Sequence, residues 1–151
     1  LVKRQAEVEI LPLAMSEELG VIPYSPLGGG LLTGKYGPGK KPEKGRIVSN
    51  QMYSVRYGED WMFKAAAKFS ELAEKAGVAP ASLAVRWVAE HPGVTAPIIG
   101  ARNLDQLEES LASLDIEMTE DLYKEVSEIT WMPAIATDRT EEIDKIMYKS
   151  K

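Results

Sequence analysis

The chain of 151 residues contains no cysteine and a single histidine. The absence of cysteine excludes disulfide bonds, thiolate catalysis and cysteine-ligated zinc. One histidine also excludes a metal site built from several histidines, so we expect no metal centre. No apolar run approaches the roughly 20 residues of a membrane-spanning helix, and no segment has the pattern of a signal peptide. We therefore expect a cytoplasmic protein that does not insert into a membrane.

Positive charge is also scarce. Eighteen Lys and Arg residues stand against 23 Asp and Glu residues, which gives a formal net charge of -5. This mild acidic excess argues against a nucleic-acid-binding protein, because such proteins carry a basic field. Hydrophobic residues make up 44% of the chain and charged residues 27%, which are ordinary globular proportions. The length suits one domain over residues 1–151.

Helical periodicity accounts for most of the chain. The spacing of apolar residues predicts helices over residues 5–19, 60–76, 80–90, 104–114 and 119–130, and a last amphipathic stretch over 140–148. Asn103 is expected to cap the helix that follows it, with Gln106 completing a capping box. The predicted buried stripe of that helix consists of Leu104, Leu107, Leu111 and Leu114.

Two short apolar segments, residues 21–25 and 96–99, predict buried β-strands. Strands that are apolar on both faces are typical of the middle of a parallel sheet covered by helices. Two strands do not form a stable sheet by themselves. We therefore expect the chain to be an incomplete part of a larger α/β protein. The alternative is an all-helical domain with two buried extended segments.

A glycine-rich stretch, residues 28–57, follows the first predicted strand and shows no periodicity. A segment of this length without regular structure is often a functional lid. Its glycines allow the backbone to approach a phosphate, and free N–H groups there can bind an anion. Gly29, Gly34 and Lys35 have P-loop spacing, but Tyr36 stands where magnesium requires Ser or Thr. A P-loop is therefore rejected, and a surface loop without a ligand stays as the alternative.

The second predicted strand also ends at a glycine turn that leads into a helix. Gly100 and Arg102 stand before this helix, whose first N–H groups and positive dipole end favour an anion. Arg102 has the planar fork that suits phosphate, although a solvated surface arginine is the commoner case. Near the first turn, Glu43 is accompanied by the basic residues Lys35, Lys40, Lys41, Lys44 and Arg46. Such a local cluster in an acidic chain indicates a small anionic ligand.

Phosphate sites after the last two strands recur in (β/α)₈ barrels. Four motifs in this chain are VIPYSPL at residues 21–27, LTGKY at 32–36, IIGAR at 98–102 and QLEE at 106–109. In their order and spacing, they resemble the aldo-keto reductase family, in its bacterial and potassium-channel-β-subunit-like branches. The resemblance covers about residues 1–130. It implies an α/β fold that is the C-terminal part of a (β/α)₈ TIM barrel, with strands seven and eight at the two predicted strands.

The resemblance also implies that the chain binds NADP(H), without the Rossmann fingerprint, which is absent here. Tyr24 would stack on the nicotinamide, and Gly100 with Arg102 would hold the adenosine 2′-phosphate. The other implied contacts are Ser25, Leu27, Gly28 and Gly30 along the pyrophosphate, Lys35 and Arg46 at a phosphate, and Gln106 and Glu109 on the adenine side. The glycine-rich stretch would close over the cofactor. Ser110 departs from the Asn that is usual in the family.

Catalysis is a different matter, because nothing in residues 1–151 corresponds to the family's catalytic Asp, Tyr, Lys and His. His91 stands in a turn at a helix end, which indicates a surface or C-cap residue. We therefore assign no catalytic residue. In the tail, Trp131, Met132 and Tyr148 would help to shape the substrate mouth, or Trp131 merely packs the last helix on the barrel.

The implied function is the NADPH-dependent reduction of aldehydes or ketones to alcohols, with a small carbonyl substrate. This chain would supply the cofactor-binding half and would be inactive alone. Its expected partner is the missing N-terminal half of the barrel, or a second copy through self-association. Two alternatives stay open: a non-catalytic NADP(H)-sensing subunit, and an inactive truncated fragment that self-associates.

Overall fold

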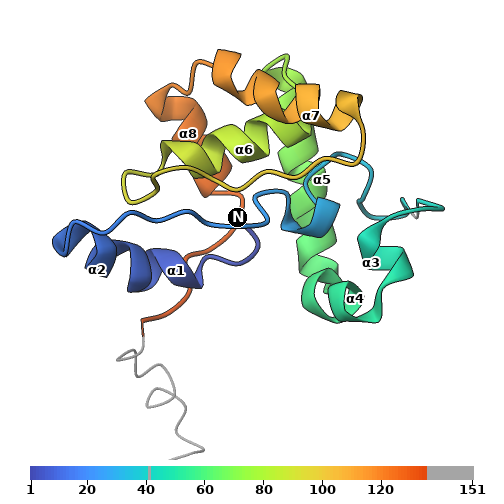
Figure 1. Ribbon diagram of the computed structural model, residues 1–151. Coiled ribbons are helices and arrows are strands. Elements are labelled where there is room, and N and C mark those ends of the chain that lie inside the picture. The colour runs from blue at the N-terminus through green and yellow to red at the C-terminus, as the bar shows by residue number, and fades with distance from the viewer. Residues whose placement is uncertain (41, 136–151) are drawn as a thin grey trace, which may run out of the picture.

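A computed structural model describes residues 1–40 and 42–135 of the chain (Figure 1). The helices within these residues are α1 (Gln5–Val8), α2 (Ile10–Ser16), α3 (Arg46–Ser49), α4 (Gln51–Tyr57), α5 (Asp60–Lys75), α6 (Pro80–Glu90), α7 (Leu104–Leu111) and α8 (Glu120–Ser127). Two 3₁₀ turns, η1 (Gly28–Gly30) and η2 (Ala112–Asp115), complete the set of elements. Lys41, Tyr148 and the predicted stretch at 140–148 lie outside the described residues.

The two predicted strands are present as extended segments that share one parallel bridge, between Tyr24 and Ile98. The Ile98 N–H donates to the Pro23 carbonyl at 2.8 Å, and the Thr95 N–H donates to the Val21 carbonyl at 2.8 Å. Proline has no N–H, so neither Pro23 nor the proline before Ile98 can donate to extend the ladder. Within the described residues the two segments therefore form one bridge and no regular strand, although they do lie side by side and parallel.

Helices α5 to α8 begin and end close to the predicted positions. Pro80 begins α6 at a position where its missing N–H breaks no helical hydrogen bond. Asn103 caps α7 by accepting the Gln106 N–H at 3.0 Å, and Thr119 caps α8 in the same way. Gln106 does not return the bond that a capping box requires. Its Oε1 instead accepts the Arg102 N–H at 3.2 Å.

Two other segments differ from the prediction. The predicted helix over residues 5–19 is broken at Glu9 into α1 and α2, because Pro12 has no N–H and its ring crowds the carbonyl four residues earlier. The predicted irregular stretch folds into α3 and α4 at its end. Asn50 begins α4 by accepting the N–H groups of Met52 at 3.0 Å and Tyr53 at 3.4 Å. This N-cap is the sequence signal that the periodicity analysis missed.

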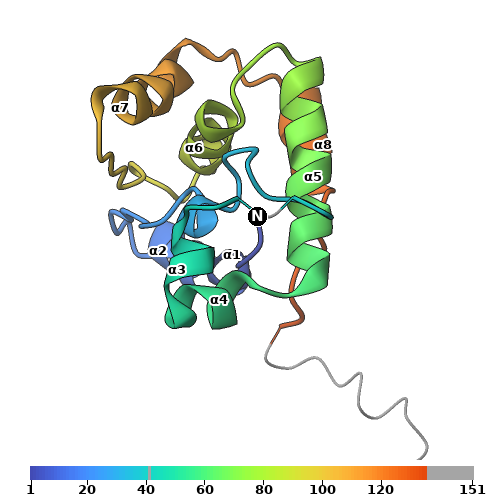
Figure 2. The same cartoon turned by 90° about the vertical axis from the view of Figure 1, so that its right-hand side faces the viewer.

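The core is built around α6, which contacts α5, α7 and α8 (Figure 2). Met62 and Phe69 of α5 and Leu83 of α6 are completely buried. Other buried members of this core are Leu1, Val2, Leu31, Leu32, Tyr36, Ile47, Tyr57, Ala65, Ala66, Ala73, Ala84, Trp87 and Val126. The residues that follow the η1 turn thus anchor it to the helical layer.

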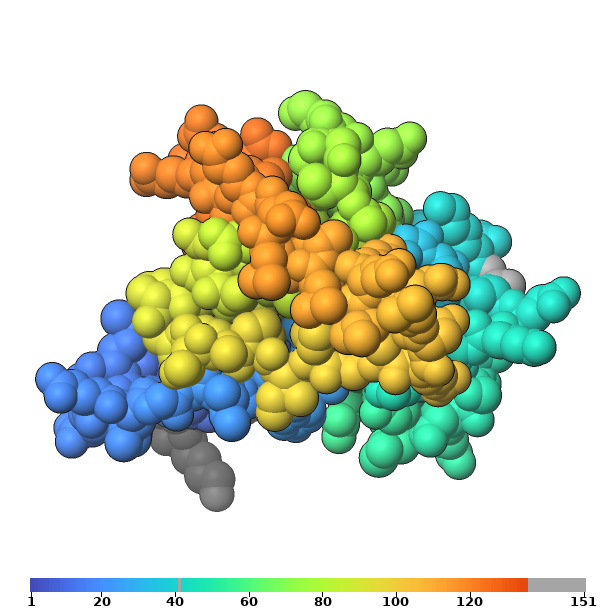
Figure 3. Space-filling view, turned by 45° about the horizontal axis from the view of Figure 1, so that its top comes forward, coloured from blue at the N-terminus to red at the C-terminus, as the bar shows by residue number. Residues whose placement is uncertain are grey.

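The leucine stripe of the predicted helix over 104–114, which spans α7 and η2, is exposed, which contradicts the prediction that it is buried. The exposed fractions are 64% for Leu104, 37% for Leu107, 46% for Leu111 and 78% for Leu114. Helix α7 instead packs on α6 through its other face, where the Ser82 hydroxyl donates to the Glu109 carbonyl at 2.6 Å. Figure 3 shows this part of the chain, in amber and orange, on the outer surface. Within residues 1–40 and 42–135, nothing covers the leucine stripe.

Arg4 is a buried charge that ties the N-terminal segment to the end of α8. Its guanidinium pairs with both carboxylate oxygens of Glu7, at 2.8 Å from Nε and 2.6 Å from Nη2. Nη1 donates to the carbonyls of Ser127 at 2.7 Å and Thr130 at 3.3 Å. The guanidinium carbon also lies 5.6 Å from the centre of the Trp87 ring. Breaking one side of such a buried pair is costly because it leaves the other charge without a partner.

We predict that Arg4→Met lowers the free energy of unfolding by about 3 kcal/mol, because the partly buried Glu7 carboxylate would lose its partner. The double variant Arg4→Met with Glu7→Leu removes both charges and should recover the part of this loss that comes from Glu7, but not the part that comes from the bonds of Arg4 to the Ser127 and Thr130 carbonyls. Urea unfolding followed by circular dichroism measures both effects. A double variant that is as unstable as the single one would show that the charge pair is not the cause.

Candidate functional site

A cleft of about 560 Å³ lies between the glycine turn after residues 21–25 and the turn that leads into α7. The bridge between Tyr24 and Ile98 places the ends of the two parallel segments together, so the two turns meet at one edge. Ten of the residues implied as cofactor contacts line this cleft: Tyr24, Ser25, Leu27, Gly30, Lys35, Arg46, Gly100, Arg102, Gln106 and Glu109. Lys35 follows the first glycine turn and Arg102 follows the second, and both side chains therefore line one cleft.

Gly28 is the exception among the implied contacts, because it lines the neighbouring cavity instead. Its N–H donates to the Ser25 carbonyl at 2.9 Å, and the Gly30 N–H donates to the Leu27 carbonyl at 3.0 Å. Gly29 lines the cleft, and its N–H has no protein acceptor within the described residues. A run of three glycines gives no sequence signal of which N–H the turn leaves unpaired. Gly29 is therefore a site residue that sequence reasoning missed.

Further residues line the cleft that were not among the implied cofactor contacts: Pro26, Thr33, Gly45, Ala81, Ile98, Ile99, Ala101 and Ser110. Ser110 is almost completely buried, and its hydroxyl donates to the Gln106 carbonyl at 2.9 Å. Helical spacing could have indicated Ser110, because it follows Gln106 by four residues and so lies on the same face of α7.

The charged side chains of the cleft are three cations and one acid: Lys35, Arg46, Arg102 and Glu109. The Lys35 Nζ lies 3.6 Å from the position that a Cβ would occupy at Gly30, so the ammonium stands over the glycine turn. It is also 5.4 Å from the centre of the Tyr36 ring. The excess of positive charge in a concave site, within a chain of net charge -5, favours a small multiply charged anion.

The turn that leads into α7 is open on the cleft side. A Cβ built at Gly100 would meet no atom within 4 Å, which leaves space for a ligand to approach the backbone. The hydrogen bond from the Arg102 N–H to the Gln106 side chain fixes this turn against the first turn of α7. Gln106 therefore uses its carboxamide oxygen to hold the turn, and its implied contact on the adenine side stays a prediction.

Tyr24 is the aromatic residue at one end of the cleft, and 73% of its surface is exposed. The next residue, Ser25, has a φ of 58°, a left-handed conformation that is uncommon for a residue other than glycine. Such strained turns are often found at binding sites, where the surrounding structure maintains them. Tyr24 lines both this cleft and the neighbouring cavity.

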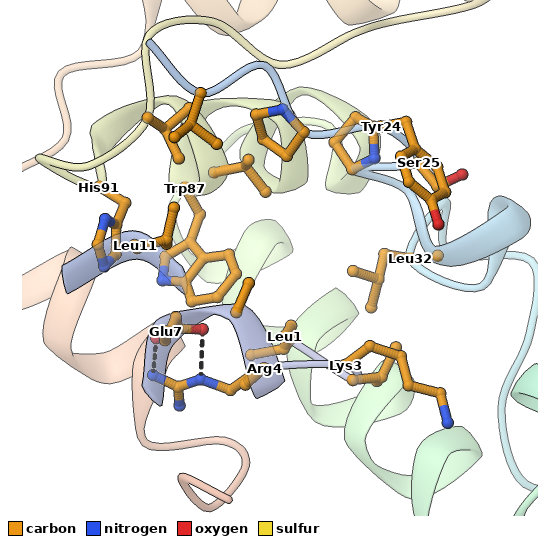
Figure 4. A pocket seen from close by; sticks show the side chains of 18 of the residues that line it. Leu1, Lys3, Arg4, Glu7, Leu11, Tyr24, Ser25, Leu32, Trp87 and His91 are labelled. Atoms are coloured by element: carbon orange, nitrogen blue, oxygen red, sulfur yellow. Dashed lines mark hydrogen bonds and ion pairs between the residues drawn. The ribbon is translucent and has the colours of Figure 1, made fainter. Parts of the chain in front are cut away.

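A second cavity of about 470 Å³ lies on the other side of Tyr24 and is shown in Figure 4. Its lining includes Leu11, Trp87 and His91, with the pair formed by Arg4 and Glu7 at its edge. Burial raises the pKa of Tyr57, another lining residue, and the nearby Arg56 opposes this change.

His91 and the tail residues have mainly structural contacts. His91 is the C-cap residue of α6, as predicted, and its Nδ1 accepts the Gly93 N–H at 3.0 Å. The Trp131 ring packs against Trp61 of α5, with 4.6 Å between ring centres. Over residues 1–40 and 42–135, no helix is long and apolar enough to cross a membrane, and no three potential metal-ligating side chains form a group.

We predict that alanine destabilises the fold at one glycine of the cleft and has little effect at another. Gly29 has a φ of 68°, and a Cβ there would lie 2.7 Å from the Tyr53 ring, so Gly29→Ala should destabilise the fold by about 1–3 kcal/mol. Gly100→Ala is the matched control and should change the free energy of unfolding by less than about 0.5 kcal/mol. Thermal unfolding of both variants measures this. Equal losses would contradict the described packing of α4 on the glycine turn.

Comparison with known proteins gives one family. The family model described as Aldo/keto reductase family matches residues 1–130 of the chain. "Protein tas" of Escherichia coli is 34% identical over 131 residues, which are 85% of this chain and 37% of that protein. "Uncharacterized oxidoreductase YrpG" of Bacillus subtilis is 34% identical over 132 residues, again 85% of this chain and 37% of that protein.

A plant protein named "Probable voltage-gated potassium channel subunit beta", from Arabidopsis thaliana, is 31% identical over 116 residues. The match covers 76% of this chain and 35% of the plant protein. The chain therefore spans little more than a third of the length of the relatives that it matches.

Proposed function

The chain belongs to the aldo/keto reductase family, and from this membership we propose that it forms the NADP(H)-binding part of an enzyme that reduces aldehydes or ketones to alcohols. The family and the relative named as an oxidoreductase support an oxidoreductase role in general. The observation that carries the finer proposal is the shared cleft, in which Lys35, Arg46 and Arg102 gather around one open space.

The residues of the cleft fit a dinucleotide with three anionic groups. The unpaired Gly29 N–H and the Lys35 ammonium would bind the pyrophosphate, and Arg102 would bind the adenosine 2′-phosphate. The exposed ring of Tyr24 would stack on the nicotinamide. Glu109, which lines the cleft, would lie on the adenine side. When bound, NADPH supplies the hydride, and this chain binds and orients it.

We further propose that the chain is the C-terminal part of a (β/α)₈ barrel, the fold that membership of this family implies. The segments at 21–25 and 96–99 would be strands seven and eight. Ile22 is 62% exposed and Ile98 52% exposed, so both segments have apolar side chains that nothing covers within the described residues. The N-terminal half of the barrel would cover these side chains and the leucine stripe of α7. Self-association of this chain is the alternative cover.

A second candidate function is a non-catalytic subunit that senses NADP(H). The observation that favours it is the similarity to the Arabidopsis protein that is named as a potassium channel subunit beta. The same cleft would serve both functions, since each requires only that the dinucleotide is bound. The presence of a proton-donating tyrosine and its lysine in the rest of the barrel would distinguish the enzyme from the sensor.

We predict that Arg102→Ala, in the chain joined to the rest of its barrel, raises the Kd for NADPH by about 10- to 100-fold, because a charge-assisted contact to the 2′-phosphate is lost. The Kd for NADH should change by less than about threefold, since NADH has no such phosphate. Isothermal titration calorimetry measures both values. Arg56→Ala, outside the cleft, is the matched control and should change neither. Equal losses for the two cofactors would refute the role of Arg102.

The chain alone should not reduce a carbonyl compound, because the general acid is proposed to lie in the other half of the barrel. The expected result is no oxidation of NADPH above the buffer rate when an aldehyde is added to residues 1–151. Oxidation is followed by the loss of absorbance of the reduced nicotinamide. Turnover above the buffer rate would mean that a proton donor lies within this chain, with Tyr24 and His91 as the first residues to replace.

A further inference from the structure

Helix α4 packs on the glycine turn through a tyrosine that neither the motifs nor the cleft lining identifies. The Tyr53 ring lies so close to Gly29 that a Cβ there would be 2.7 Å from its Cδ1 and 3.0 Å from its Cε1. On another side, the ring stacks with Tyr57 at 6.2 Å between centres and an interplanar angle of 30°. The elements α3 and α4 both contact η1 (Figure 1). The ring is thus held in place by its surroundings.

Arg46, at the start of α3, lies over the same ring, with its guanidinium carbon 5.6 Å from the ring centre. Arg46 is exposed, and none of the ion pairs formed among residues 1–40 and 42–135 involves it. A long exposed arginine side chain adopts many rotamers, so fixing it has an entropic cost. The face of a tyrosine ring attracts a guanidinium at this distance and offsets part of that cost.

We propose that Tyr53 is a positioning residue, which holds the Arg46 guanidinium over the cleft so that it meets a phosphate of the bound dinucleotide. This inference rests on the proposed function. The same ring packs against Gly29 of the glycine turn, so the turn fixes the ring beneath Arg46. Tyr53 itself does not line the cleft and acts through Arg46.

The test compares Tyr53→Leu with Tyr53→Phe in the chain joined to the rest of its barrel, with NADPH as the probe. Tyr53→Leu removes the aromatic face and should raise the Kd for NADPH about threefold or more, whereas Tyr53→Phe keeps the face and should bind as the parent does. Arg46→Ala should have the same effect as Tyr53→Leu, and combining the two should add little. Arg102 contacts neither Tyr53 nor Arg46, so the effect of Arg102→Ala on the Kd for NADPH should add in full to that of Tyr53→Leu.

The outcomes separate this inference from the proposed function. If Tyr53→Leu raises the Kd for NADPH by the same factor in the parent and in the Arg46→Ala variant, the role of Tyr53 is structural and the inference is overturned. If Arg46→Ala has no effect while Arg102→Ala does, the inference also fails but the proposed function stands. If neither Arg46→Ala nor Arg102→Ala changes the Kd for NADPH, the proposed function fails as well.

A measurement on the unmodified protein keeps the inference testable even if Tyr53→Leu does not fold. A guanidinium over the face of a ring has its nearby protons shifted upfield by the ring current. The side-chain protons of Arg46 should therefore resonate upfield of those of Arg56 in the proton spectrum. Ordinary positions for the Arg46 protons would overturn the inference.

Discussion

The hydrogen bond from the Ile98 N–H to the Pro23 carbonyl is the contact on which the site depends. It joins two segments that are more than seventy residues apart in the sequence and sets them parallel. Parallel segments end at the same edge, so the glycine turn after the first and the turn before α7 face each other. Without this pairing, the cations of the two turns would belong to separate surfaces.

The electrostatics of the cleft follow from where the chain places its few cations. The chain carries more acidic than basic residues overall, yet three basic side chains and one acid line the cleft. The glycine turn supplies Lys35, the start of α3 supplies Arg46, and the turn before α7 supplies Arg102. A multiply charged ligand is attracted to this cleft even though the molecule as a whole repels anions.

The sequence predicted those features that local physical chemistry determines. The apolar spacing of α5 and the cap of α7 by Asn103 are properties of a few neighbouring residues, and both are present. Ten of the eleven residues that the resemblance implies as cofactor contacts also line the cleft. Their contact with NADP(H) stays a prediction.

Features that depend on distant parts of the chain could not be predicted. Periodicity identifies the apolar face of α7 but not whether anything covers Leu104 and Leu114, which are exposed in the described part of the chain. Whether Gly28 or Gly29 lines the cleft with an unpaired N–H depends on the hydrogen bonds of the turn and on the contact with Tyr53. A run of glycines in the sequence indicates neither. Regular strands at 21–25 and 96–99 would require neighbouring strands that the described residues do not provide.

The most direct test of the account is an amide NMR titration of the chain with NADPH. The account predicts that the amides of Gly29 and Gly30 in the first turn and of Gly100 and Arg102 in the second shift together, with one common Kd. Shifts confined to one turn, or different Kd values for the two turns, would contradict the claim that both turns bind the same dinucleotide.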